Sequence, residues 1–481
     1  MKDKTKAILK DKNITKTIFL LSLPVMISNV LKSVHDLVDI YFISNLPLSK
    51  ESIEAQVSAI TLTNPVIQIS NAIALGLMIA GTSIMSKHIG AKDESKAKMV
   101  SGQLFVLSFI TGIVVNVILF FLTHPILHLM NIKIGTMLYE NAYLYLRYRS
   151  FECIFLYVFY AFVATKQASG DTITPVIFNV VSIFINIVLT WLFLSRLHMT
   201  LDGAALATVI SNAMIVPVCL ILLRKKKNNP IRLEPKHLLF CKKVISDLFK
   251  VGFPATLSFV ITSLAFIIIN RLVVDFDSTT IYAIGIGNRI NALLLLPTLS
   301  IGTIITTFVG QNMGAKQYER VKKGCILAMV LTISITIVLG LVMYVLRDYL
   351  LSIFIKKSVS SDAFVLCKKF LLLLILGFPF MGCFQVWVGY FQGIGRTDLG
   401  LILSSIRLWI IRLPLLFIMI YRFHYGSFSV YYSMIISNAA VALLGIMMYQ
   451  YVKIDATKIK KTDKKLHYKE DKNGKKQHSF I

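Results

Sequence analysis

The sequence predicts an all-α polytopic membrane protein whose twelve transmembrane helices form two pseudo-symmetric six-helix lobes around a central cavity. Three observations support this prediction: the long apolar segments, an internal repeat, and polar side chains on one face of the first apolar segment. Of the 481 residues, 56% are hydrophobic, and the mean hydropathy is +0.71. This hydrophobic fraction exceeds that of an ordinary soluble domain.

Twelve segments are long and apolar enough to cross a bilayer, which takes about 20 apolar residues each. The expected spans are 18–43, 57–86, 98–122, 141–165, 175–195, 201–223, 248–273, 281–309, 321–346, 364–392, 398–420 and 428–452. They leave no length of chain for a soluble domain.

The second half of the chain repeats the first. Residues 58–98 align without a gap with residues 282–322, and the triplet Gly-Ala-Lys recurs in both. Further matches at nearly the same separation pair Gln167, Gly170 and Thr172 with Gln392, Gly395 and Thr397, and residues 210–213 with 436–439. Because each repeat contains six spans, an even number, the two halves share one orientation in the membrane.

The positive charge is placed as in a membrane protein. If the N-terminus is cytoplasmic, the segments on that side carry about three times as many Lys and Arg as those outside, which is the positive-inside pattern. We therefore expect a multi-pass protein of the cytoplasmic membrane with both termini inside, and not a nucleic-acid-binding protein, despite the net charge of +27. The predicted parts are an N-lobe (1–223), a cytoplasmic linker (224–247), a C-lobe (248–452) and a basic cytoplasmic tail (453–481).

Glycines mark the short connections between spans. Gly90 and Gly314 belong to the repeated Gly-Ala-Lys triplet, and Gly170 and Gly395 occupy matching turns in the two halves. Each is expected to supply a residue with positive φ at a helix end.

The first span carries polar residues on one face. Ser28, Lys32, His35, Asp36 and Asp39 fall within about 100° of one another on a helix. Lipid would penalise each charge by about 2.5–3.5 kcal/mol, so this face should line a water-filled cavity.

Asp39 is the leading candidate on this face. A carboxyl group in a cavity of low dielectric constant can load and release a proton near neutral pH. Lys32 and Asp36 are four residues apart and can neutralise each other, which would leave Asp39 unpaired. Asp36 could instead bind the coupling ion or the substrate directly. Alternatively, Asp39 lies at the outer end of the helix beside water or a base. His35 can shuttle protons or be simply hydrogen-bonded.

The fifth span has a polar face of its own. Asn179, Ser182, Asn186 and Thr190 fall within about 80° on a helix. They can supply oxygens and amides facing Asp39, or hold neighbouring helices together at about 0.6 kcal/mol per contact. In the C-lobe, Asn288 and Gln385 are candidates for lining the cavity.

Two intramembrane arginines of the C-lobe, Arg407 and Arg412, are expected to be structural. They could bond exposed carbonyls near Pro414 or acidic groups at a helix end.

Four short motifs resemble the multidrug and toxic compound extrusion (MATE) family, in its DinF/MepA-like bacterial branch. They are VGQNMGAK at 309–316, SKHIGAK at 86–92, LVDIYFI around Asp39 and QASGDTITP at 167–175. The resemblance covers residues 15–452. It implies a V-shaped exporter of twelve helices that exchanges a cation for bulky, often cationic organic compounds.

The resemblance also implies roles for individual residues. Asp39 matches the family's first-helix carboxylate, the candidate for binding the coupling ion. Asn186 matches the family's fifth-helix Asn, but Thr190 stands where the family has Asp, which removes one hard ligand from a sodium site. Thr208, within GAALATVIS, resembles a family position near this site.

The expected function is therefore cation-coupled antiport of organic compounds, driven by H⁺ or Na⁺. No cofactor and no metal is expected, apart from a Na⁺ that could bind at Asp39 and Asn186. Small organic substrates and membrane lipids are the expected partners of a monomer. The alternative is a flippase of lipid-linked saccharides from the same superfamily. A Walker P-loop and the enzyme motifs HExxH and GxSxG are absent from the sequence.

Overall fold

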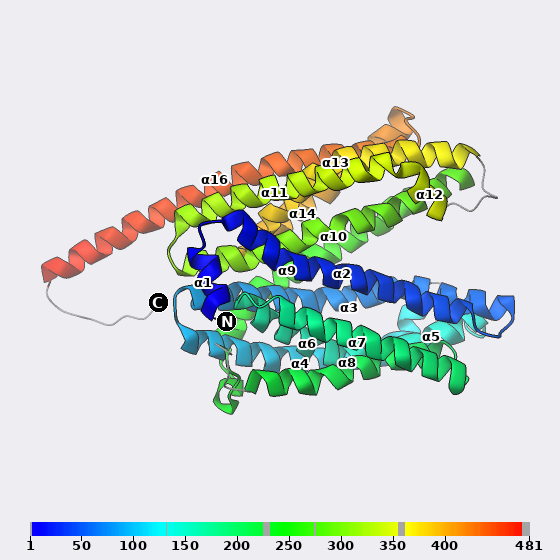
Figure 1. Ribbon diagram of the computed structural model, residues 1–481, viewed down its shortest axis with the longest axis horizontal. Helices are drawn as coiled ribbons and strands as arrows, with labels where there is room; N and C mark the ends of the chain where they lie inside the picture. Colours follow the sequence, from blue (N-terminus) through cyan, green and yellow to red (C-terminus); the bar gives the residue numbers. More distant parts are fainter. Residues whose placement is uncertain (1, 131, 225–230, 274–275, 355–360, 474–481) are drawn as a thin grey trace.

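The computed structural model describes residues 2–473, except 131, 225–230, 274–275 and 355–360 (Figure 1). Helices account for nearly all of the described chain. Eleven of them are long and apolar enough to cross a membrane, or twelve if α5 and α6, bent by 42° relative to each other, form one span. The predicted all-α membrane fold is thus confirmed.

The first half of the chain forms the helices α1 to α8. Their bounds are α1 Lys2–Lys10, α2 Ile14–Ser44, α3 Lys50–Gly90, α4 Glu94–Leu129, α5 Met137–Ser150, α6 Glu152–Ala168, α7 Ile173–Trp191 with the π-helical extension η1 Leu192–Arg196, and α8 Leu201–Arg224. The predicted span 141–165 is interrupted between α5 and α6. The interruption falls in the stretch where Arg147, Arg149 and Glu152 break the apolar run.

The second half follows the same order after a short 3₁₀ helix. Its elements are η2 Pro235–Leu238, α9 Lys242–Val273, α10 Ser278–Gly314, α11 Tyr318–Val345, α12 Arg347–Phe354, α13 Ser361–Gly393, α14 Thr397–Ser405, η3 Ile406–Arg412, α15 Leu413–Phe417, η4 Ile418–Arg422 and α16 Phe428–Asn473. The helix α9 begins inside the predicted linker.

Figure 1 shows two groups of helices that approach each other at the end where α1 lies and separate toward the opposite end. One group contains α3 to α8, and the other contains α10, α11, α13, α14 and α16. The first membrane-spanning helices of the two halves, α2 and α9, lie between the groups. Each group has its own apolar core, around Tyr157 and Phe162 in one and around Phe308 and Phe391 in the other.

Backbone details repeat between the halves. The π-helical segments η1 and η4 occupy equivalent positions, and each is followed by a histidine with positive φ, His198 (52°) or His424 (53°). Gly170 and Gly395 have φ of 79° and 82°, so the predicted glycine turns are confirmed there.

The prediction for Gly90 and Gly314 is wrong. The residues with positive φ in these turns are Lys92 (61°) and Lys316 (58°). The glycines instead allow α3 and α10 to cross closely, because a Cβ at Gly90 would overlap the carbonyl oxygen of Gln311. The equivalent Cβ at Gly314 would overlap the carbonyl oxygen of Lys87.

Candidate functional site: a cavity between the two groups of helices

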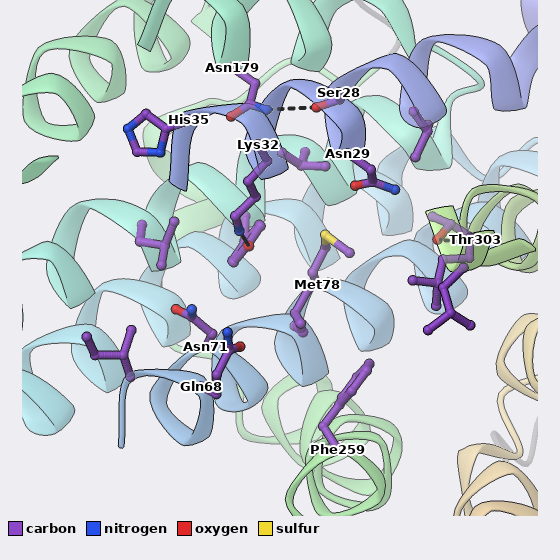
Figure 2. Close-up of a pocket in the computed structure, with 18 of the residues that line it drawn as sticks. Ser28, Asn29, Lys32, His35, Gln68, Asn71, Met78, Asn179, Phe259 and Thr303 are labelled. Carbon is purple, nitrogen blue, oxygen red and sulfur yellow. Dashed lines mark hydrogen bonds between the residues drawn. The ribbon is translucent and has the colours of Figure 1, made fainter. Parts of the chain in front are cut away.

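A cavity of about 710 Å³ lies between the two groups, and helices of both halves line it. This volume is in the range of small-molecule binding sites. Its wall mixes apolar side chains with polar ones, among them Phe259 and Met78 beside Gln68 and Asn71 (Figure 2). Flexible methionines and flat aromatic rings can adapt to differently shaped ligands.

The polar face of α2 points into this cavity. Ser28, Lys32, His35 and Asp39 all line it, and Figure 2 shows the first three of them. Four of the five residues of the predicted polar face thus line the cavity. The side chain of Asp36 lies outside the described residues.

Asp39 is not isolated in the cavity wall. Its Oδ2 lies 3.7 Å from His35 Nε2, and its side chain is 21% exposed. The expectation of an unpaired Asp39 is therefore wrong: a residue four positions earlier on the same helix faces it. Lys32 Nζ donates to the hydroxyl of Tyr160, 3.4 Å away on α6.

The polar face of α7 is used mainly to hold neighbouring helices. Asn186 Nδ2 donates to Thr208 Oγ1 of α8 (3.1 Å), and Thr190 Oγ1 donates to Asn186 Oδ1 (3.4 Å). Asn186 and Thr208 line the cavity, whereas Thr190 is fully buried and lies outside the lining. The amide of Asn186 is thus oriented by a hydroxyl on either side.

Nearer the start of α7, two residues bond to neighbouring helices and also line the cavity. Asn179 Nδ2 donates to Ser28 Oγ of α2 (2.7 Å; Figure 2). Ser182 Oγ donates to Asn212 Oδ1 of α8 (3.3 Å).

A buried carboxylate that the sequence analysis overlooked continues this network. Asn212 Nδ2 donates to Glu152 Oε1 (3.1 Å), and Glu152 Oε2 lies 2.9 Å from a guanidinium nitrogen of Arg149. All three residues line the cavity, and Glu152 is 8% exposed. The available signal was that Glu152 is the one acidic residue in the predicted span 141–165.

The C-lobe side of the wall differs from its prediction. Gln385 lines the cavity, as expected, but Asn288 does not and is exposed. The lining of α10 begins at Asn291, one turn further along, so Asn288 has the right face but lies beyond the end of the cavity. Arg407 and Arg412 also line the cavity instead of bonding carbonyls near Pro414.

The polar wall does not contain an obvious metal centre. Across the described chain, no three His, Cys, Asp or Glu side chains gather closely enough to hold a metal ion. The acidic and basic side chains of the described N-lobe wall are Asp39, Glu152, His35, Lys32 and Arg149. This set can bind and release a proton or accept a charged ligand.

Relatives of known name cover nearly the whole chain. It is 24% identical over 446 residues to "Probable multidrug resistance protein YoeA" of Bacillus subtilis (strain 168), covering 91% of this chain and 93% of that one. It is 26% identical over 448 residues to "Multidrug export protein MepA" of Staphylococcus haemolyticus (strain JCSC1435), covering 93% and 96%.

Solved structures share the fold. A structure described as the outward-facing conformation of a multidrug resistance MATE family transporter of the MOP superfamily superposes with a TM-score of 0.84 at 22% identity, covering 92% of this chain and 97% of that one. A crystal structure of MATE in the bent conformation also gives 0.84 at 22% identity, with coverage of 95% and 98%. The MatE family model matches residues 24–192 and 254–418. The chain therefore belongs to the MatE family of membrane transporters, as its sequence motifs indicated.

Proposed function

We propose that the protein is a cation-coupled antiporter that exports organic, often cationic, compounds across the cytoplasmic membrane by alternating access. The observation that carries the proposal is the polar face of α2, including Asp39, which lines a cavity between two groups of helices. The names of the relatives, multidrug resistance and multidrug export proteins, favour drug export over the flippase alternative.

The helix α2 is placed to couple an ion to the movement of the two groups. Its neighbouring residues Ser28 and Asn29 bond to opposite halves: Ser28 accepts from Asn179 (2.7 Å), and Asn29 Nδ2 donates to Ser300 of α10 (3.1 Å). An ion that binds further along the same helix, at Asp39, can therefore shift contacts with both halves. It does so only to the extent that it binds the two conformations differently.

A proton fits this role with the groups at hand. Protonation of Asp39 removes a negative charge 3.7 Å from His35, so the contact across this helical turn changes when a proton binds. A sodium ion would need hard oxygen ligands, and of the two carboxylates in the described wall, Asp39 and Glu152, the second is already paired with Arg149 at 2.9 Å. The proton is therefore the favoured coupling ion.

The charge pattern indicates which side of the membrane the described conformation faces. With the termini in the cytoplasm, as the distribution of Lys and Arg indicates, the groups of helices meet on the cytoplasmic side and separate toward the outside. The conformation described here is then the one that releases substrate outward.

Dye efflux tests the proposal. Energised cells that produce the protein are loaded with ethidium, and the loss of fluorescence is compared with that of cells carrying the empty vector. We expect efflux several-fold faster with the protein, abolished when the ion gradients are collapsed. Equal rates with and without the protein, for ethidium and for other organic cations, would contradict drug export.

A further inference from the structure

Two buried arginines stand together in the C-lobe wall of the cavity. Arg407 and Arg412 are each 5% exposed, and both line the cavity. They occur within the π-helical segment η3, Ile406–Arg412. In an α-helix, residues five apart point about 140° away from each other. The i→i+5 bonding of a π-helix instead stacks such residues one turn apart, and such segments are frequent at functional sites.

The partners of these arginines are all neutral. Arg412 donates to Ser437 Oγ (3.0 Å) and to Asn438 Oδ1 (2.9 Å). Arg407 donates to the same Asn438 Oδ1 (3.5 Å) and to Met381 Sδ (3.5 Å). Its guanidinium carbon also lies 4.3 Å from the centroid of the Phe384 ring.

The two positive charges lack a counter-charge within the part of the chain that the structure describes. Neither arginine forms an ion pair there, and the buried Nε of Arg407 has no hydrogen-bond acceptor. Burying one ion costs several kcal/mol unless an opposite charge compensates. Here two cations converge on one amide oxygen, so an anion entering from the cavity would relieve both costs.

The internal repeat allows the C-lobe wall to be compared with the N-lobe wall, position by position. Asn438 is the counterpart of Asn212, whose amide donates to the carboxylate of Glu152 in the N-lobe. At the position in α13 equivalent to Glu152, the chain has Gly377. The C-lobe thus has the amide of this network, no carboxylate at the equivalent position, and two arginines in its place at the cavity wall.

We propose that Arg407 and Arg412 bind the anionic group, a carboxylate or phosphate, of an organic molecule in the cavity. A guanidinium presents paired N–H donors that match such a group in bidentate fashion. Phe384 and Met381 provide an apolar surface beside it for the rest of the molecule. The occupant is an organic anion or a zwitterion, and its identity as cargo rests on the transport function proposed above.

Ligand charge provides the first test. The protein, purified in nanodiscs of phosphatidylcholine, is titrated with dansylglycine, which carries a carboxylate, and with the neutral dansylamide. We expect dansylglycine to bind at least tenfold more tightly. Arg407→Gln and Arg412→Gln should weaken dansylglycine binding at least tenfold without changing dansylamide binding, and Arg412→Lys should lie between them and the unchanged protein.

Arg289→Gln is the matched control, because Arg289 is an exposed arginine of the C-lobe that does not line the cavity. It should bind both probes as the unchanged protein does. Equal binding of the two probes, or equal dansylglycine affinity in all variants, would overturn the anion site.

Two additional arms identify the natural source of the anion. Displacement of dansylglycine by phosphatidylglycerol in the nanodisc, lost in the Gln variants, assigns the site to a lipid headgroup. Displacement by inorganic phosphate alone assigns it to a free anion. Displacement by neither supports the carboxylate of a transported amphiphile.

A measurement on the unchanged protein covers the case in which the Gln variants do not fold. At equal probe concentration its melting temperature should rise more with dansylglycine than with dansylamide, and equal shifts would overturn the proposal. Absent ethidium efflux together with arginine-dependent dansylglycine binding would refute the export function and leave the anion site standing. The reverse combination would refute only the anion site.

Discussion

Glu152 is the buried carboxylate on which the polar wall of the N-lobe converges. It pairs with Arg149 at 2.9 Å across the bend between α5 and α6 and accepts from Asn212 of α8. Both charged side chains are mostly buried. An ion pair with so little solvent around it holds two helices together. Removing one partner is costly, because it leaves an uncompensated buried charge.

A double-mutant cycle measures this pair. Glu152→Gln and Arg149→Gln should each lower the free energy of unfolding, and the double variant should lose less than the sum of the two. The expected coupling is about 1–3 kcal/mol, from unfolding in mixed detergent micelles. Glu54→Gln, which changes an exposed carboxylate, should cost less than about 0.5 kcal/mol. A coupling energy of zero would contradict the structural role of the pair.

Helical spacing in the sequence shows which residues share a face of a helix, and this limits which site residues could be predicted. The helical spacing of Ser28, Lys32, His35 and Asp39 was enough to predict that they face the cavity. Spacing does not show where along the helix a cavity ends, so Asn288 was wrongly included.

Spacing also shows nothing of contacts between distant segments or of local helix type. For this reason the partnership of Glu152 with Asn212, and the shared face of Arg407 and Arg412 in η3, were not predicted.

The short helix α1 joins the two halves at the end where the termini lie. Thr5 Oγ1 donates to the Ser169 carbonyl of the N-lobe (3.2 Å), while Arg320 Nε of the C-lobe donates to the Ile8 carbonyl (3.0 Å). The guanidinium thus satisfies a carbonyl at the C-terminus of α1, where a cation is also favoured by the helix dipole. Asp11 stays ionised near Arg320, because hydrogen bonds from the backbone N–H of Asn13 and the hydroxyl of Thr17 hold the pKa of Asp11 below its usual value.

Removing the hydrogen bond from Arg320 to the Ile8 carbonyl should release α1 from the C-lobe. Arg320→Ala should increase amide hydrogen exchange in residues 2–10 at least several-fold, since the helix loses its anchor on the C-lobe. Hydrogen exchange with mass spectrometry measures it. Lys322→Ala, an exposed position on the same helix α11, is the control and should leave the exchange unchanged. Unchanged exchange in Arg320→Ala as well would show that α1 is held by other contacts.

The crossing of α3 and α10 at Gly90 and Gly314 closes the same end of the molecule. Gly90→Val should force the two helices apart there, because its side chain would overlap the backbone of Gln311. We expect cysteines introduced at that end to react several-fold faster with a polar maleimide in this variant.

Gly285→Ala is the control for this prediction, because a Cβ at Gly285 of α10 would meet no atom within 4 Å. It should leave cysteine labelling unchanged. Equal labelling in Gly90→Val and the unchanged protein would mean that the glycine crossing does not close this end.

At the scale of the whole molecule, the fold was predictable because its signals are long and redundant. The long apolar runs fix the spans, and the repeat fixes the shared orientation of the halves. The structure adds that the repeat extends to backbone irregularities, such as η1 and η4, which hydropathy does not report. The halves differ in the charges that line the cavity: Glu152 lines it from one half, and Arg407 and Arg412 line it from the other.

The most direct test of the central claim, that a cation bound at Asp39 drives export, is transport in proteoliposomes under a single imposed gradient. Either a proton gradient or a sodium gradient is applied alone, and ethidium transport is followed for the unchanged protein, Asp39→Asn and the exposed control Asp247→Asn. We predict that the proton gradient drives transport in the unchanged protein and in Asp247→Asn, and that Asp39→Asn is inactive although it folds and inserts normally. Transport by Asp39→Asn at the rate of the unchanged protein under the same gradient would contradict the account.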